Sequence, residues 1–197
     1  SLLSIFLLWF CLPIDVHANW YDNLSDETEI SILTSSPGED AYSIFGHTAV
    51  RIYDPAEVPI VDWVFNYGTF SYSEDFYYNF MIGRLDYHLS AVPFYQFQRD
   101  YMDQGRGVKE QILNLTPAHI RQVAEYLSWN LQEENAVYRY EFFRDNCSTR
   151  VITLFQESLG ESFETNCKQS GKTFRDGLQP YISGSPWIAF GMDFILG

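Results

Sequence analysis

One cysteine of this chain has the surroundings of a catalytic nucleophile. Cys147 follows the polar pair Asp145-Asn146, and a helical pattern begins directly after it. The first backbone N–H groups of a helix lack partners and the helix dipole is positive there, so a cysteine at this position is favoured as a thiolate. A cysteine that only fills the core seldom lies between asparagine and serine, although a small buried cysteine without chemistry is the alternative.

The base expected to pair with this thiol is His47, far earlier in the chain. Gly46 precedes it, and a strand-like run continues from it. A thiolate at the start of a helix and an imidazole on a strand form the reactive pair of papain-like cysteine enzymes. His88 is a rival base because it also lies in a strand-like run, whereas His119 is expected on the exposed side of a helix. The alternative for His47 is a core histidine with satisfied hydrogen bonds.

A papain-like site also needs a polar side chain that orients the imidazole. Asn66 and Asp62 share one face of the next predicted strand, so either side chain could reach His47. Asparagine in this role is typical of papain-type sites, which favours Asn66. A structural contact between neighbouring strands is the alternative.

The oxyanion that develops during acyl transfer needs hydrogen-bond donors. We expect the backbone N–H of Cys147 to be one donor and the side chain of Asn146 or Tyr42 to be another. Tyr67 is a further candidate for contact with the substrate. Asp145 is expected to cap the helix instead of acting as a catalytic acid.

Strand and helix patterns alternate along the chain and must position these residues. Alternating apolar runs predict strands over residues 28–34, 46–53, 60–67, 84–92, 107–115 and 136–143. Helical periodicity and cap residues predict helices over residues 75–82, 93–104, 117–133 and 147–160. The nucleophile would therefore lie where the last strand passes into the last of these helices.

Composition limits the classes of function. A length of 197 residues fits one domain, and 46% hydrophobic residues can form its core. The net charge of −14 argues against nucleic acid and against a basic patch that adheres to anionic lipid. The histidines are scattered and no metal-ligand or phosphate-loop motif occurs, so neither a metal nor another cofactor is expected.

Aromatic residues make up 18% of the chain, more than packing alone requires. Such a surplus either fills the core or lines a groove for an apolar ligand. A dense group that could form a lipid-facing wall consists of Phe70, Tyr72, Phe76, Tyr77, Tyr78 and Phe80.

The N-terminal segment indicates export. Residues 1–18 match a signal peptide because an apolar run is followed by Val16 and Ala18, small residues at the positions of a signal-peptidase site. An uncleaved membrane anchor is the alternative. We expect the start of the signal to be missing and residues 19–197 to form a single exported domain. The chain stops inside an apolar run, which favours a fragment truncated at its C-terminus.

The cysteines allow a second interpretation. Of the 3 cysteines, Cys147 and Cys167 remain once Cys11 is removed with the signal peptide. An even pair in an exported protein is typical of a disulfide, which would consume the nucleophile. Cys167 lies in a polar loop without strand context, so we favour a free thiol at Cys147.

The order of histidine before cysteine resembles the circularly permuted NlpC/P60-like proteins. These include the lecithin:retinol acyltransferase family, in which an Asn-Cys pair opens the nucleophile helix as Asn146-Cys147 does here. Over roughly residues 28–197 the chain more closely resembles the N-terminal periplasmic domain of the Lnb-type bacterial lipoprotein N-acyltransferases. The segments that carry this resemblance are Phe45-Gly46-His47-Thr48-Ala49, Phe65-Asn66-Tyr67-Gly68, Gly105-Arg106, Glu110-Gln111-Ile112-Leu113-Asn114-Leu115 and Asp145-Asn146-Cys147-Ser148-Thr149-Arg150.

The resemblance implies an α+β, circularly permuted papain-like fold, in which an antiparallel sheet packs against the helix that bears the nucleophile. It implies that Cys147 takes an acyl chain from a phospholipid or diacylglyceryl lipid, with His47 as general base. The N-terminal amine of a bacterial lipoprotein would then accept the chain. It also implies a place at the outer face of the inner membrane, held there by C-terminal membrane helices that this sequence does not contain. The alternatives are a cysteine peptidase or amidase acting on peptidoglycan peptides, and a non-enzymatic periplasmic module that binds lipid or a partner.

Overall fold

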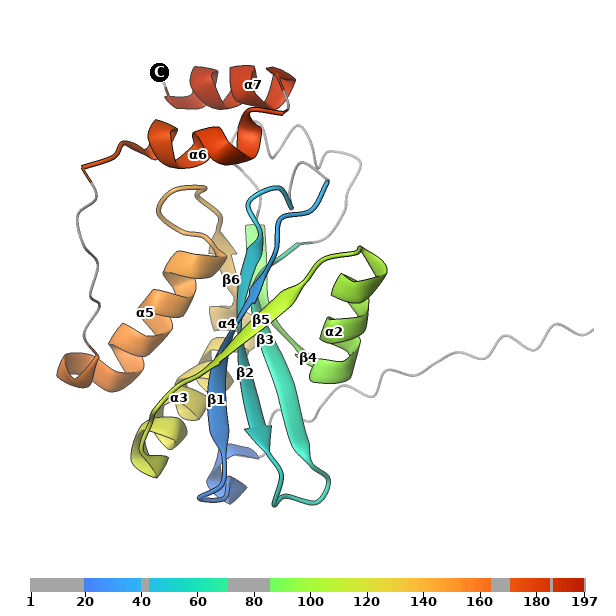
Figure 1. Ribbon diagram of the computed structural model, residues 1–197. Coiled ribbons are helices and arrows are strands. Elements are labelled where there is room, and N and C mark those ends of the chain that lie inside the picture. Colours follow the sequence, from blue (N-terminus) through green and yellow to red (C-terminus); the bar gives the residue numbers. More distant parts are fainter. Residues whose placement is uncertain (1–19, 40–42, 71–85, 164–170, 185, 197) are drawn as a thin grey trace, which may run out of the picture.

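A six-stranded antiparallel sheet forms the centre of the protein, in the strand order β5-β1-β2-β3-β4-β6 (Figure 1). The computed structural model describes residues 20–39, 43–70, 86–163, 171–184 and 186–196. The strands are β1 (Glu29–Ser35), β2 (His47–Asp54), β3 (Val61–Thr69), β4 (Asp86–Pro93), β5 (Val108–Ile112) and β6 (Val137–Arg139). The predicted α+β class is confirmed.

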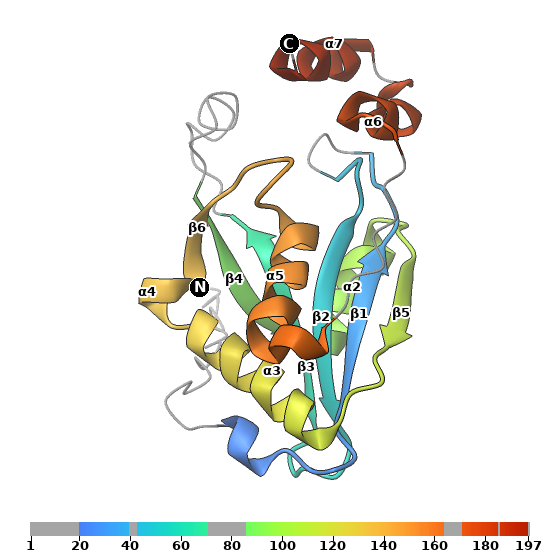
Figure 2. The same ribbon diagram turned by 90° about the vertical axis from the view of Figure 1, so that its left-hand side faces the viewer.

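Helices cover both faces of the sheet, as Figures 1 and 2 show. Helices α3 (Pro117–Asn130) and α5 (Cys147–Leu159) lie on one face, and α2 (Phe94–Asp103) lies on the other. The remaining helical segments are η1 (Trp20–Asn23), α4 (Glu133–Ala136), η2 (Gly160–Ser162), α6 (Phe174–Ile182) and α7 (Pro186–Leu196). Within the part of the chain that the structure describes, no helix combines the length and apolar character needed to cross a bilayer.

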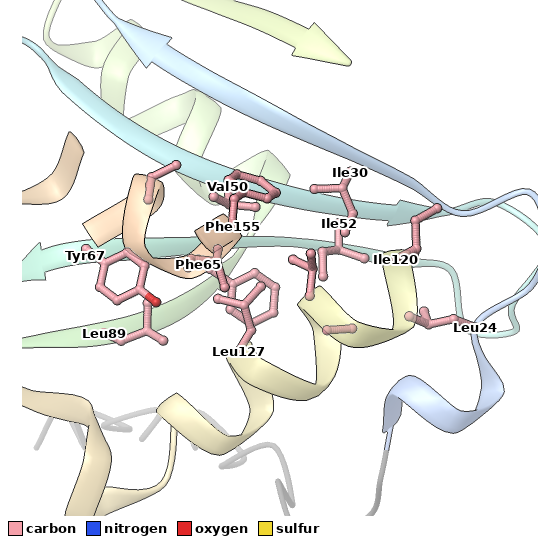
Figure 3. Close-up of a cluster of buried hydrophobic side chains, with 14 of the residues drawn as sticks. Leu24, Ile30, Val50, Ile52, Phe65, Tyr67, Leu89, Ile120, Leu127 and Phe155 are labelled. Atoms are coloured by element: carbon pink, nitrogen blue, oxygen red, sulfur yellow. The ribbon is translucent and has the colours of Figure 1, made fainter. Parts of the chain in front are cut away.

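Alternation along β2 explains this layering. Val50 and Ile52 are fully buried and pack in the main core with α3 and α5 (Figure 3). Ala49 points to the other face, where it is also fully buried and packs with Phe97 of α2. Because alanine is small, α2 can approach this strand closely. The strand that begins at His47 is therefore held between two helical layers.

An apolar stripe packs α3 onto the sheet. Thr116 caps this helix by accepting a hydrogen bond from the backbone N–H of His119. The buried stripe, spaced by three or four residues, packs onto the sheet and consists of Ile120, Val123, Ala124 and Leu127 (Figure 3).

Three predicted elements are shorter than expected. The strand predicted over 136–143 ends at Arg139, because the backbone of Glu141 exchanges hydrogen bonds with Asp145 and closes a turn. The strand predicted over 107–115 spans only Val108–Ile112. The helix predicted over 117–133 stops at Asn130, and the short α4 follows it. The helix predicted over 75–82 lies outside the described residues.

Candidate active site

The nucleophile candidate opens α5. Cys147 is the first residue of this helix, and Asn146 is its N-cap. The Asn146 side-chain oxygen accepts hydrogen bonds from the backbone N–H groups of Ser148 and Thr149 at 2.9 and 3.0 Å. The Thr149 hydroxyl accepts from the Asn146 N–H at 2.8 Å, which completes a capping box. The expectation that Asp145 caps the helix is therefore wrong, because Asp145 instead forms a two-point ion pair with Arg150.

This capping arrangement leaves the backbone N–H of Cys147 available. The first four N–H groups of a helix have no acceptor inside it. Those of Ser148 and Thr149 go to the Asn146 side chain, and that of Arg150 goes to the Asn146 carbonyl. Within the described part of the chain, neither the Asn146 side chain nor the Asn146 carbonyl accepts a hydrogen bond from the N–H of Cys147. The Asn146 amide N–H donates to the Phe142 carbonyl at 2.8 Å, so the cap occupies much of its hydrogen-bonding capacity.

His47 lies beside the thiol and hydrogen-bonds to it. On its other side, the Nε2 atom of His47 lies 3.3 Å from Oδ1 of Asn66. An amide oxygen can only accept, so this contact fixes the proton on Nε2 and leaves Nδ1 to accept the thiol proton. The Asn66 amide nitrogen makes a longer contact, 3.5 Å, to the Val64 carbonyl. The structure thus brings Cys147, His47 and Asn66 together, with the imidazole between the thiol and the amide oxygen.

The rival residues lie elsewhere. Asp62 shares the face of Asn66, as expected, but both of its oxygens bind the guanidinium of Arg51, at 2.7 and 3.0 Å. His88 lies on β4, opposite Thr69 and Val137 in the strand register. His119 lies in the first turn of α3. Asn66 is therefore the polar partner of His47 that the structure provides.

The position of His47 depends on the glycine before it. Gly46 has a φ of +78°, and a Cβ at this position would lie 2.7 Å from the Ser35 carbonyl oxygen. A side chain is therefore excluded both by the backbone conformation and by the neighbouring strand. This tight turn lets β2 begin at His47, directly at the end of the sheet where α5 starts.

The surroundings of Cys147 favour its thiolate. Burial alone raises the pKa of this thiol, but the hydrogen bond and positive charge of His47 lower it, as do the backbone N–H of Thr48 and the Ser148 hydroxyl. The result is a pKa of about 7. The hydroxyls of Thr48 and Ser148 also lie 3.0 Å apart, which ties β2 to the start of α5. Cys147 carries a free thiol and is half-buried.

A tyrosine on α2 supports the imidazole from its far side. The Tyr101 ring stacks on His47, with centroids 6.4 Å apart and planes at 13°. The Arg106 guanidinium lies over the same ring at 4.6 Å, and Arg106 also donates to the Ser35 hydroxyl and the Ser36 carbonyl. Tyr101 and Ser35 were not among the site residues predicted from the sequence. The one hint in the sequence was the Gly105-Arg106 pair, which follows the end of α2. Tyr101 lies in the last turn of this helix, beside His47.

Beneath Cys147 the site has an aromatic floor formed by Tyr87, Tyr138 and Tyr140. The rings of Tyr87 and Tyr140 stack at 4.4 Å, and Tyr138 lies 6.4 Å from Tyr87. Gly68 opens the space between the floor and the nucleophile, since a Cβ there would lie 3.9 Å from both the Tyr138 hydroxyl and the Cys147 Cβ. Burial raises the pKa of Tyr138 and of Tyr140, so both stay neutral. The thiolate therefore faces uncharged rings.

Other predicted residues lie away from this arrangement. Tyr67 is 1% exposed and its hydroxyl donates to Oδ1 of Asn130 at 2.7 Å, so the structure places it in the core (Figure 3). Phe70 packs against Tyr87 at 5.3 Å in the same cluster. Tyr42, Cys167 and the remaining aromatic residues of the predicted wall lie outside the described residues. Within the described ranges, no cluster of side chains could hold a metal ion.

Comparison with protein families identifies the domain. A family model described as the Lnb N-terminal periplasmic domain matches residues 17–179. The chain belongs to this family. The matched range includes the six strands of the described sheet, His47, Cys147 and most of α6. The family description gives the domain a periplasmic location. Comparisons with curated proteins and with solved structures found no match.

The ionisation of Cys147 gives a direct test of the pair. We expect alkylation by iodoacetamide to increase with pH through a midpoint near 7, because the thiolate is the reactive form. In His47→Gln the midpoint should rise, since burial still raises the pKa of the thiol and the lowering effect of His47 is lost. The rate at Cys147 is measured by peptide mass spectrometry over pH 5 to about 10. An unchanged midpoint in His47→Gln would show that His47 does not activate the thiol.

Proposed function

We propose that this Lnb domain is a thiol-dependent acyltransferase that works through an acyl-Cys147 thioester. The Lnb family is tied to lipoprotein N-acylation. The observation that carries the proposal is the hydrogen-bonded Cys147–His47 pair at the start of α5, with Asn66 bound to the other imidazole nitrogen. The acyl donor is a phospholipid or diacylglyceryl lipid, and the acceptor is the N-terminal amine of a bacterial lipoprotein.

The proposed reaction has two halves, acylation of Cys147 and transfer of the acyl group to the amine. In the first, Nδ1 of His47 takes the thiol proton and Sγ of Cys147 attacks the ester carbonyl of the donor. The Cys147 N–H donates to the oxyanion, the ester C–O bond breaks, and the imidazolium returns its proton to the leaving alcohol, which leaves a lysolipid. In the second, the amine attacks the thioester and His47 accepts a proton from the amine. The C–S bond then breaks, and the imidazolium returns this proton to the sulfur of Cys147. The products are an amide and the free enzyme.

The aromatic floor favours acyl transfer over hydrolysis. A thioester is hydrolysed when water reaches it, so transfer to an amine requires that water be excluded. The rings of Tyr87, Tyr138 and Tyr140 face this side of Cys147 and stay uncharged. A peptidase or amidase, in which water must attack the acyl-enzyme, would be served better by a polar floor.

We also propose that the domain has a circularly permuted papain-like fold. The antiparallel sheet, the nucleophile at the start of α5 and the earlier histidine on β2 support this assignment. Residues 1–18 are proposed as the signal peptide and residues 19–197 as a single domain that acts at the outer face of the inner membrane. Its substrates reach it from the lipid surface.

Mass spectrometry of the intact protein tests this function. Incubation with mixed micelles of detergent and phosphatidylethanolamine is expected to add one acyl mass to Cys147, in a form released by hydroxylamine. Addition of a diacylglyceryl-cysteine peptide should then remove the adduct and produce the N-acylated peptide. Release of free fatty acid without any N-acylated peptide would identify a hydrolase. A protein isolated with Cys147 bonded to Cys167 would support the non-enzymatic module.

A further inference from the structure

An open groove of about 800 Å³ lies between α6 and the loop that leads into α5. Figures 1 and 2 show α6 across this end of the molecule, beyond the end of the sheet. The groove is apolar on both sides and is lined by Phe142, Phe143, Phe174 and Leu178, with Asn146, Lys172 and Gly177. Its volume is in the range of pockets that bind small ligands.

We propose that this groove binds the fatty acyl chain of the donor lipid while its carbonyl lies at Cys147. The inference rests on the proposed function and adds the place and the chemistry of the chain-binding subsite. Asn146, which lines the groove, is the residue directly before the nucleophile. The groove therefore adjoins the start of α5, where the thiol lies.

The groove is a formed feature, because α6 is packed against the domain. Leu178 and Ile182 are 9% and 1% exposed and form a cluster with Ile44. The Tyr181 ring lies 5.9 Å from that of Phe45, two residues before His47. Thr173 and Asp176 form a capping box at the start of α6, on the side of the groove. The wall formed by α6 is thus fixed relative to the start of β2.

The groove leaves apolar surface that an acyl chain would cover. The Phe174 side chain is 63% exposed although its ring contacts Phe143 at 4.6 Å. An exposed aromatic side chain within an apolar hollow is typical of a ligand site. Each methylene that an apolar site buries strengthens binding by about fourfold, so a long chain gains affinity that a short one lacks. The groove therefore favours long-chain donors.

One cationic side chain lies in the lining of the groove, and its charge is opposite to that of a phospholipid phosphate. Lys172 lies in the lining of the groove and is exposed, in a protein whose net charge is −14. Its positive charge is opposite in sign to the phosphate of a glycerophospholipid and to most charges of this protein, among them the Asp176 carboxylate of α6, with which it interacts. The combination of apolar walls and one cation fits an acyl chain with a nearby phosphate better than it fits a peptidoglycan peptide.

Gly177 allows the groove to be filled without disturbing the fold. A Cβ at this position would have no atom of the described residues within 4 Å, and its backbone needs no glycine. Gly177→Trp therefore places a large side chain into the groove. Gly184→Trp is the matched control, because Gly184 also has open space around it but does not line the groove.

The test compares two thiol-acylating probes, p-nitrophenyl acetate and p-nitrophenyl palmitate in detergent. Mass spectrometry measures the rate of adduct formation at Cys147 in the wild type and both variants. We expect Gly177→Trp to lower palmitoylation by about tenfold or more, the effect of roughly two buried methylenes, while acetylation stays unchanged. Gly184→Trp should match the wild type with both probes, and thermal melting should show that both variants fold.

The possible outcomes distinguish a failure of the proposed chain-binding subsite from a failure of the proposed acyltransferase function. Equal palmitoylation of the wild type and Gly177→Trp would overturn the subsite while leaving Cys147 as the acylated residue. Failure of both probes to acylate Cys147 in the wild type would instead overturn the proposed function itself. A loss of acetylation together with palmitoylation in Gly177→Trp would mean that the substitution disturbs the nucleophile and not a chain-binding subsite.

Discussion

Cys147→Ser is expected to abolish acyl transfer, on the order of 10⁴-fold or more, and to leave the fold intact. The thiol of Cys147 has a pKa of about 7, so a large share is thiolate at neutral pH. A serine hydroxyl in the same place is almost isosteric but stays protonated. His47 alone then has to remove a far less acidic proton. The measurement is formation of N-acylated peptide from a phospholipid donor and a diacylglyceryl-cysteine peptide.

The matched control for this variant is Cys167→Ser, which we expect to retain activity. Cys147 is half-buried and unbonded, so its replacement should change the free energy of unfolding by less than about 1 kcal/mol. A structural disulfide would instead make both substitutions destabilising by roughly 2–5 kcal/mol. Full activity of Cys147→Ser would exclude an acyl-cysteine intermediate.

The largest effect on stability is expected from Asp54→Ala. Asp54 is fully buried at the end of β2 and accepts hydrogen bonds from the N–H and hydroxyl of Ser25, at 2.6 and 2.7 Å. It also accepts from the Thr28 hydroxyl at 2.9 Å and the Ala56 N–H at 3.0 Å. Alanine would leave these donors without an acceptor, at a cost of about 3–5 kcal/mol in the free energy of unfolding. Urea denaturation followed by circular dichroism measures this change.

The pH dependence of this difference gives a second readout. Burial raises the pKa of Asp54, but the hydrogen bonds from Ser25, Ala56 and Thr28 outweigh it and hold the pKa below its usual value. A lowered folded-state pKa stabilises the protein above the unfolded-state pKa, about 3.9, and this contribution is lost as the pH falls further. The stability difference between wild type and Asp54→Ala should therefore be constant near neutral pH and shrink below about pH 4.

Asp86→Ala is the control for the loss of one negative charge. Asp86 pairs with Arg139 at 3.0 Å, and both side chains are about 60% exposed. An exposed pair of this kind contributes at most about 1 kcal/mol, so the variant should unfold close to the wild type. A similar loss in Asp54→Ala and Asp86→Ala would contradict the role of the buried hydrogen bonds.

Local sequence was enough to predict the parts of the site that depend on local structure. Cys147 could be placed at a helix start because capping residues act within one turn. Asn66 could be placed beside His47 because residues on adjacent strands alternate faces with a fixed period. Local sequence favoured Asn66 over Asp62 only by its residue type, because both lie on the same face of the strand. The structure does so through Arg51, whose partners Asp62 and Glu110 come from two other strands.

The residues that sequence analysis did not find are those brought in by tertiary contacts. Tyr101 lies on a helix whose position depends on the packing of Phe97 against Ala49, and no local pattern reports such packing. The groove beside α6 has the same origin, since the segment that forms it shows little periodicity. The error over 140–143 is different: an apolar aromatic run has strand propensity, and the turn closed by Glu141 and Asp145 prevails over it.

The reactive pair joins residues from distant parts of the chain, and this has a consequence for the protein's biogenesis. An unfolded chain has no His47, Thr48 N–H or helix start beside Cys147, so its thiol keeps the ordinary pKa of about 8.5. The newly exported polypeptide therefore passes through a compartment rich in disulfide-forming catalysts while its nucleophile is still mostly protonated. Completion of the sheet and docking of α5 create the thiolate. Folding thus creates the reactive form of the nucleophile in this enzyme candidate.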